Sequence, residues 1–112
     1  MLIKHPIIED KGLSYSSLEG PENSVFVRGI IRNTDTIKLP LEWEHIVNPH
    51  SITVSITPIG AHQNIMIKRA SCREVVIQTL SSIPISCYYH VFGERNDIKK
   101  LEIIVDYLPE EL

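Results

Sequence analysis

Apolar and polar residues alternate along several short runs of this chain, and a period of two is typical of β-strands that bury one face. The clearest run covers residues 51–57, where isoleucine and valine alternate with serine and threonine. Other runs rich in β-branched and aromatic residues predict strands at residues 13–18, 24–31, 36–39, 64–68, 74–78, 85–93 and 101–107. We expect the runs at 24–31 and 36–39 to pair as a hairpin.

Seven or eight short strands spaced about ten residues apart predict an all-β fold, either a small antiparallel β-sandwich or a partly open barrel. One segment departs from this pattern. Residues 40–48 begin with proline and carry early acidic residues, so they predict a short helical turn that places Trp43 over one end of the core. We expect residues 1–112 to form a single β domain with residues 1–23 as an irregular lead-in segment.

The run at residues 85–92 differs from the others because neither of its faces is polar. Cys87 and Val91 alternate with Tyr88, His90 and Phe92. A strand with apolar or aromatic residues on both sides is typical of a position that is covered on both sides. The pattern therefore predicts either a central strand or a face that meets another subunit.

The chain has an ordinary composition for a globular protein, with 43% hydrophobic and 22% charged residues and a net charge of -3. Its basic residues are scattered, and the only adjacent pairs are Lys68-Arg69 and Lys99-Lys100. Nucleic-acid binders usually concentrate positive charge, so we expect no nucleic-acid partner. No apolar run approaches the ~20 residues that span a bilayer, so we expect no membrane insertion.

Two cysteines are present, Cys72 and Cys87. We expect two free thiols, with a single disulfide between them as the alternative. Cys87 lies in an alternating run and is expected to act as a small buried hydrophobe. Cys72 lies in a polar loop, where Arg69 and Arg73 would favour its thiolate. The N-terminus lacks the apolar core of a signal peptide, so we expect synthesis in a reducing cytoplasm.

Residue types that carry catalysis or bind metals do not form a recognisable pattern. No two of the five histidines have zinc-ligand spacing, so we expect no metal and no cofactor. Cys87 and His90 are three residues apart and would lie on opposite faces of a strand, which excludes them as a nucleophile and base pair. The closely spaced carboxylates fit structural roles better than acid–base catalysis, so we expect no enzyme: Glu19/Glu22, Glu42/Glu44 and Glu110/Glu111.

The run Ser16-Ser17-Leu18-Glu19-Gly20-Pro21-Glu22 resembles a motif from a family of β domains. These domains are common near the C-termini of tail-fibre and other structural proteins of marine tailed phages. In that family the motif Ser-x-x-Glu-Gly-Pro-Glu leads to Tyr-x-Arg-Gly, and here Phe26 takes the aromatic position before Arg28 and Gly29. The resemblance continues in order and covers nearly the whole chain, through residues 4–6, 36–40, 51–60, 93–98 and 101–102.

The resemblance implies a non-enzymatic structural or assembly module of a phage virion, made in the host cytoplasm. Such a module would be fibre-terminal or would decorate the particle. It would form a homo-oligomer, with a trimer favoured, beside other virion structural proteins. Domains of this family usually end long fibre proteins, whereas this chain begins with its own methionine. We therefore expect either a small independent virion protein or an expressed fragment.

Two sets of residues are candidates for the site. The motif residues are interpreted as scaffolding, with close backbone approach at the glycines and a partly buried ion-pair cluster between the arginines and the glutamates: Glu19, Gly20, Pro21, Glu22, Arg28, Gly29, Glu94 and Arg95. Tyr88, Phe92 and Tyr107 are interface or ligand contacts if they prove exposed. These three aromatic residues would serve the alternative function, a receptor- or glycan-binding tip domain of a tail fibre. The partner would then be a host surface glycan.

Overall fold

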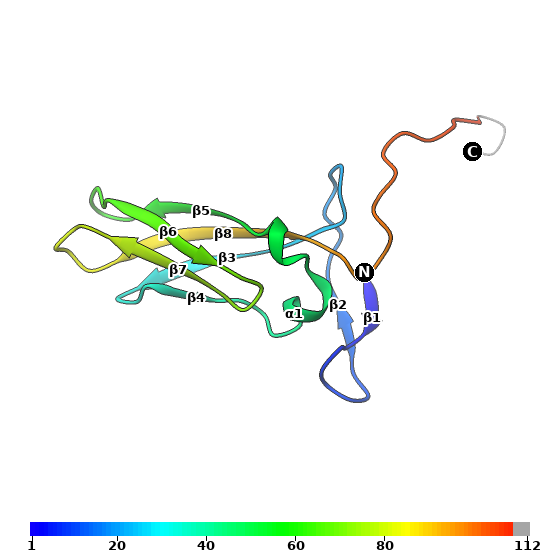
Figure 1. Cartoon of the computed structure of the whole chain (residues 1–112), viewed down its shortest axis with the longest axis horizontal. Coiled ribbons are helices and arrows are strands. Elements are labelled where there is room, and N and C mark those ends of the chain that lie inside the picture. Colours follow the sequence, from blue (N-terminus) through cyan, green and yellow to red (C-terminus); the bar gives the residue numbers. More distant parts are fainter. Residues whose placement is uncertain (109–112) are drawn as a thin grey trace.

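The computed structural model describes residues 1–108. In this range eight strands, one short helix and one 3-10 turn make up the fold, and the strands form three antiparallel sheets (Figure 1). Two three-stranded sheets pack face to face as a sandwich, and β1 (Leu2–Lys4) and β2 (Gly12–Ser14) form a separate hairpin at one end. The predicted all-β class with one short helix is confirmed, and no barrel closes among the described residues.

The first sheet has the order β3-β8-β5, with β3 at Ser24–Arg32, β8 at Ser86–Glu94 and β5 at Thr53–Pro58. β8 lies in the middle and is antiparallel to both neighbours. It pairs with β3 along the full length of both strands. The position of β8 confirms the central strand, one of the two alternatives that the sequence left open. Its even-numbered side, with Tyr88 and Phe92, is exposed, so the expected cover on both sides is absent within residues 1–108.

The second sheet has the order β4-β7-β6, with β4 at Thr36–Lys38, β7 at Glu74–Thr79 and β6 at Ile65–Ala70. The predicted hairpin between residues 24–31 and 36–39 is therefore wrong, because β3 and β4 belong to different sheets. Asn33 has a φ of 58° between them and turns the chain from one sheet to the other. Ile31 and Ile37 consequently enter the same core from its two sides.

Trp43 closes one end of the sandwich core, as the sequence predicted. It belongs to α1 (Trp43–Ile46) and is fully buried together with its neighbours Leu39, Ile46 and Val47. The helix is shorter than the predicted 40–48 because Val47 is already extended and the 3-10 turn η1 (Pro49–Ser51) follows. No helix among residues 1–108 is long and apolar enough to span a membrane.

The lead-in segment is tied to the sandwich through Tyr15. Its hydroxyl donates a hydrogen bond of 2.5 Å to Glu42 Oε1, just before α1, and its carbonyl accepts one of 2.8 Å from the Met1 amino group. Burial, strengthened by the bond to Glu42, raises the pKa of Tyr15 to about 12. The strand predicted at residues 13–18 is limited to β2, which ends at Ser14.

Residues 99–108, here named the C-terminal arm, leave the sandwich after β8 and form no strand. The prediction that residues 101–107 close the domain as a strand is wrong. Both positions beside β8 are already taken, by β3 and β5. The arm extends away from the body (Figure 1), and the radius of gyration of 17.4 Å exceeds the ~13 Å of a compact chain of this length.

Candidate functional site

The side of the β3-β8-β5 sheet that points away from the core is here named the outer face. The strand registers arrange its side chains in three rows of three, and all nine residues are exposed: Phe26, Phe92 and Thr53; Arg28, His90 and Ser55; Ile30, Tyr88 and Thr57. The alternate residues, such as Val25, Cys87 and Val91, are buried in the core. Strand alternation thus separates a filled inner face from an outer face that nothing covers within one chain.

The outer face carries a patch of large apolar side chains. Phe26 and Phe92 stack with ring centroids 5.7 Å apart and an angle of 28° between the ring planes. They are 44% and 37% exposed, and Ile30 and Tyr88 are 50% and 49% exposed in the third row. Contiguous exposed apolar side chains on one face are typical of an interaction site. The patch therefore is the strongest candidate for the function of this chain.

The structure locates the predicted contact residues in two separate places. Tyr88 and Phe92 lie on the outer face, whereas Tyr107 is 71% exposed on the C-terminal arm. Phe26 and Ile30 belong to the same patch and were not predicted as contacts. The sequence held a usable signal, since both share the even-numbered face of β3, but only the pairing with β8 makes them neighbours of Tyr88 and Phe92.

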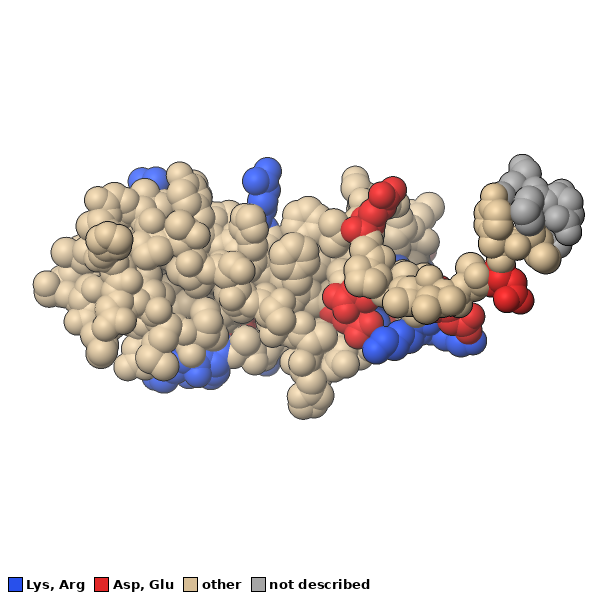
Figure 2. Space-filling view, turned by 90° about the horizontal axis from the view of Figure 1, so that it is seen from above, with Lys and Arg blue, Asp and Glu red and all other residues tan. Residues whose placement is uncertain are grey.

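The outward side of the second sheet is polar by comparison. Lys38, Lys68 and Gln78 are exposed there, Val76 is buried, and Met66 is its large exposed apolar residue. Seen from above, the sandwich shows few charges and the acidic side chains gather at the end where the arm begins (Figure 2). The two outward sides of the sandwich therefore differ in polarity, and the exposed aromatic side chains lie on the β3-β8-β5 side.

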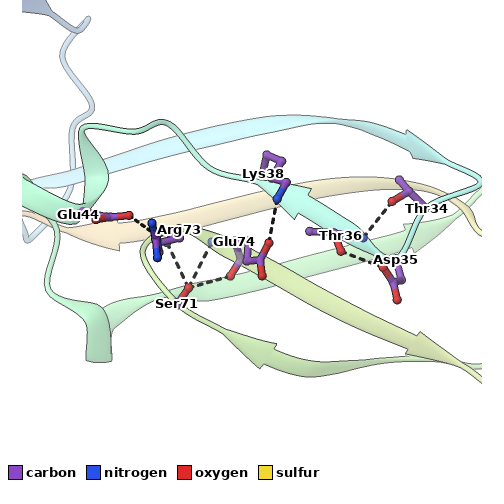
Figure 3. Close-up of polar contacts among 8 residues, drawn as sticks. All are labelled: Thr34, Asp35, Thr36, Lys38, Glu44, Ser71, Arg73 and Glu74. Atoms are coloured by element: carbon purple, nitrogen blue, oxygen red, sulfur yellow. Dashed lines mark hydrogen bonds and ion pairs between the residues drawn. The ribbon is translucent and has the colours of Figure 1, made fainter. Parts of the chain in front are cut away.

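A concave surface that carries several charged side chains lies between α1, β4 and the turn before β7 (Figure 3). Lys38 Nζ lies 3.2 Å from Glu74 Oε2, and Arg73 Nε lies 2.5 Å from Glu44 Oε1. Both carboxylates are therefore occupied by a neighbouring cation. Ser71 also bonds within this cluster, because its hydroxyl accepts from the backbone N–H of Arg73 and Glu74. The cluster joins three elements at the surface, which is a structural role.

The expected ion-pair cluster of Arg28 and Arg95 with Glu19, Glu22 and Glu94 does not form among the described residues. Arg95 instead binds Asp97 through two hydrogen bonds of 2.9 and 2.6 Å. Glu22 accepts a hydrogen bond from the Ser24 hydroxyl. Arg28 lies opposite His90 on the outer face and has no ion-pair partner in residues 1–108. The reason is the register: Arg28 lies opposite His90, five residues before Arg95, and strand alternation places Arg28 and Arg95 on opposite faces of the sheet.

The two motif glycines differ in their surroundings. A Cβ on Gly29 would lie 2.7 Å from the hydroxyl oxygen of Tyr89, so the expected close approach is confirmed at this position. A Cβ on Gly20 would meet nothing within 4 Å, and nothing in the structure requires glycine there. Pro21 beside it is exposed. The Glu-Gly-Pro-Glu segment is thus a surface loop.

Both cysteines are free and buried, which confirms the expected thiols. Cys87 lies in the core, and burial raises its pKa. The expectation of a thiolate at Cys72 is wrong, because the residue is buried and its Sγ lies 3.4 Å from the Val47 carbonyl oxygen as a donor. Burial, followed by the charge of Glu44, raises the pKa of Cys72.

Within residues 1–108, no group of three His, Cys, Asp or Glu side chains lies close enough together to hold a metal ion. Glu110 and Glu111, the last predicted carboxylate pair, lie outside the described residues. Compared with known proteins, the chain matches no family model, no curated protein and no solved structure. The resemblance to fibre-terminal domains of tailed phages stays a prediction from the sequence motifs.

Proposed function

We propose that this chain is a non-enzymatic structural module of a phage virion that packs against copies of itself through the outer face. It terminates a fibre or decorates the particle, and its favoured assembly is a trimer. The observation that carries the proposal is the exposed apolar patch of Phe26, Ile30, Tyr88 and Phe92 on a face that no part of the same chain covers. Self-association removes this patch from water.

The size of the outer face determines how much free energy and area it contributes to an interface. Burying a large apolar side chain stabilises a complex by about 1.5–3 kcal/mol, so four such residues supply a substantial driving force. Three strands of up to nine residues give a face of roughly 400 Å². A standard interface buries about 800 Å² on each partner. The outer face therefore supplies about half of a stable interface, and a second contact between copies is required.

The phage assignment rests on the sequence motifs at residues 16–22 and 25–29. Its partners are then other virion structural proteins, and its location is the particle. Mass spectrometry of purified particles of the encoding virus tests this assignment, together with cryo-EM of particles labelled by an antibody fragment against the chain. We expect to find the chain in the particles, at a site whose symmetry matches that of the proposed trimer. Its absence from washed particles would contradict the proposal.

A receptor- or glycan-binding tip is the second candidate, and the stacked pair of Phe26 and Phe92 favours it. Aromatic faces pack against sugar rings, and Thr53, Ser55 and Thr57 line the same surface with hydroxyl groups. Binding of host surface polysaccharide to the purified chain separates the two candidates. Under this second function, Phe92→Ala abolishes glycan binding and leaves the mass of the assembly unchanged.

A further inference from the structure

The C-terminal arm has the residue pattern of a strand but no sheet. Its apolar side chains Leu101, Ile103, Val105 and Tyr107 alternate with Glu102, Ile104, Asp106 and Leu108. From residue 101 onward, one side of the arm is therefore entirely apolar, and the other carries two carboxylates. One of these, Glu102, lies 3.6 Å from Lys99 Nζ in an exposed pair that is open to exchange. All of these residues are exposed, and Ile104 reaches 89%. An extended apolar segment of this kind readily pairs with an open sheet edge.

The sandwich offers such an edge along β3, which pairs with β8 alone. Two backbone hydrogen bonds just beyond the ends of β3 show which residues of β3 bond to β8. Arg95 N–H donates to the Asn23 carbonyl, and Asn33 N–H donates to the Ile85 carbonyl. Backbone groups alternate in direction along an antiparallel strand, so the odd-numbered residues bond to β8. The N–H and C=O groups of Ser24, Phe26 and Arg28 therefore point to the open edge.

A groove of about 480 Å³ runs beside this edge. Its walls are the start of β3 and the segment Ser14–Leu18, and its lining includes Met1, Val25 and Val27. Apolar side chains share this lining with serines and Arg95, and the apolar ones match the apolar side of the arm. Arg28 lies on the outer face at the same edge without an ion-pair partner among the described residues, which matches the acidic side.

We propose that the C-terminal arm of one copy adds as a strand to the β3 edge of a second copy. Leu101, Ile103, Val105 and Tyr107 then enter the groove, and Glu102 and Asp106 lie beside Arg28. This inference rests on the proposed self-association and supplies the second contact that the outer face requires. The arm points away from its own sandwich (Figure 1), so a neighbouring copy is the natural acceptor. If each copy gives its arm to the next copy in the same direction, the contacts close into a ring, as in a trimer.

Hydrogen exchange of the full chain at two protein concentrations tests the inference. Added strand pairing protects the amides of Phe26 and Arg28, and we expect exchange to slow about tenfold or more as concentration rises. Val25 and Val27 are internal controls, because their amides bond to β8 at every concentration. Val105→Asp should remove the protection of Phe26 and Arg28 and leave both controls unchanged.

The outcomes separate this inference from the proposed function. An oligomer whose Phe26 and Arg28 amides exchange freely overturns the arm exchange and leaves the outer-face assembly standing. A monomer overturns both. Protection of Phe26 and Arg28 in a species with the mass of a single chain overturns exchange between copies, because the arm then pairs with its own sandwich.

A charge reversal adds a second test of the arm position. Arg28→Glu should weaken the assembly at least about tenfold, because the new carboxylate would lie beside Glu102 and Asp106 of the added arm on the outer face. Adding Glu102→Lys and Asp106→Lys to the same chain should restore the assembly, since all copies then carry the reversed pair. Failure of the reversed chain to recover, with its fold intact by circular dichroism, overturns the proposed register.

Discussion

Phe26 and Phe92 lie opposite each other on β3 and β8 and stack with ring centroids 5.7 Å apart, on a side of the sheet that solvent reaches. A stacked aromatic pair contributes about 0.5–1.5 kcal/mol beyond the area it buries. Stability of the single chain does not require two such rings at the surface, since the core is filled by other side chains. The pair is therefore best explained by what it contacts outside the chain.

A charge placed in this pair should prevent self-association. We expect Phe92→Lys to lower the assembled fraction by at least about tenfold, because the lysine would have to lose its hydration inside the interface. Met66→Lys is the control, since Met66 is a large exposed apolar residue on the outward side of the other sheet. Sedimentation velocity measures both variants. Equal loss of assembly in the two variants would contradict the role of the outer face in the interface.

The contact of Gly93 with Val47 predicts a strong effect on stability. A Cβ on Gly93 would lie 2.6 Å from Val47 Cγ1 and 3.2 Å from Ile52 Cδ1, within the core end that Trp43 closes. We expect Gly93→Ala to lower the free energy of unfolding by about 1–3 kcal/mol through overpacking. Gly20→Ala should be nearly neutral, because its Cβ meets nothing. Urea denaturation compares the two, and similar midpoints would show that Gly93 has room for a side chain.

Tyr15 should make the stability of the fold depend on alkaline pH. Its pKa is raised from 10.0 to about 12 in the folded chain, first by burial and then by the bond to Glu42. The unfolded chain therefore loses the phenol proton first, and the stability that is fully present below pH 10 declines between pH 10 and 12. Because Tyr15 is partly exposed, we expect a decline of roughly 1 kcal/mol. Tyr15→Phe should show a shallower decline in thermal melts across this range, and parallel curves would contradict the role of the hydroxyl.

Both thiols should be unreactive in the folded chain. Cys72 and Cys87 are buried, and burial raises the pKa of each. The thiolate is the reactive form, so modification by a disulfide reagent at neutral pH should follow unfolding of the chain. Two thiols per chain should react in denaturant. Rapid labelling of the native protein at Cys72 would show that its loop opens without global unfolding.

The sequence predicted β8 and Trp43 well because both signals are local. Apolar residues on both faces of 85–92 predicted a central strand or a face for another subunit, and the strand is central. A proline followed by acidic residues predicted the turn that places Trp43. Which strands pair with one another was harder to predict from the sequence. Alternation shows which residues share a face but not which strand lies beside them, so the hairpin of 24–31 with 36–39 was wrong.

The candidate site was predicted in part for the same reason. Tyr88 and Phe92 followed from one strand, whereas Phe26 joined them only through the register of β3 with β8. The arm shows the opposite case, since its alternation predicted a strand and one chain offers it no free position beside β8. A strand pattern without an intramolecular partner is what exchange between copies would produce.

The mass of the full chain in solution tests the central claim most directly. Light scattering on the purified protein at tens of micromolar gives this mass without a label. We predict a single species at about three times the chain mass of 12.8 kDa, which Phe92→Lys converts to the single-chain mass. A monodisperse monomer of the unmodified chain at that concentration would contradict the proposed assembly through the outer face.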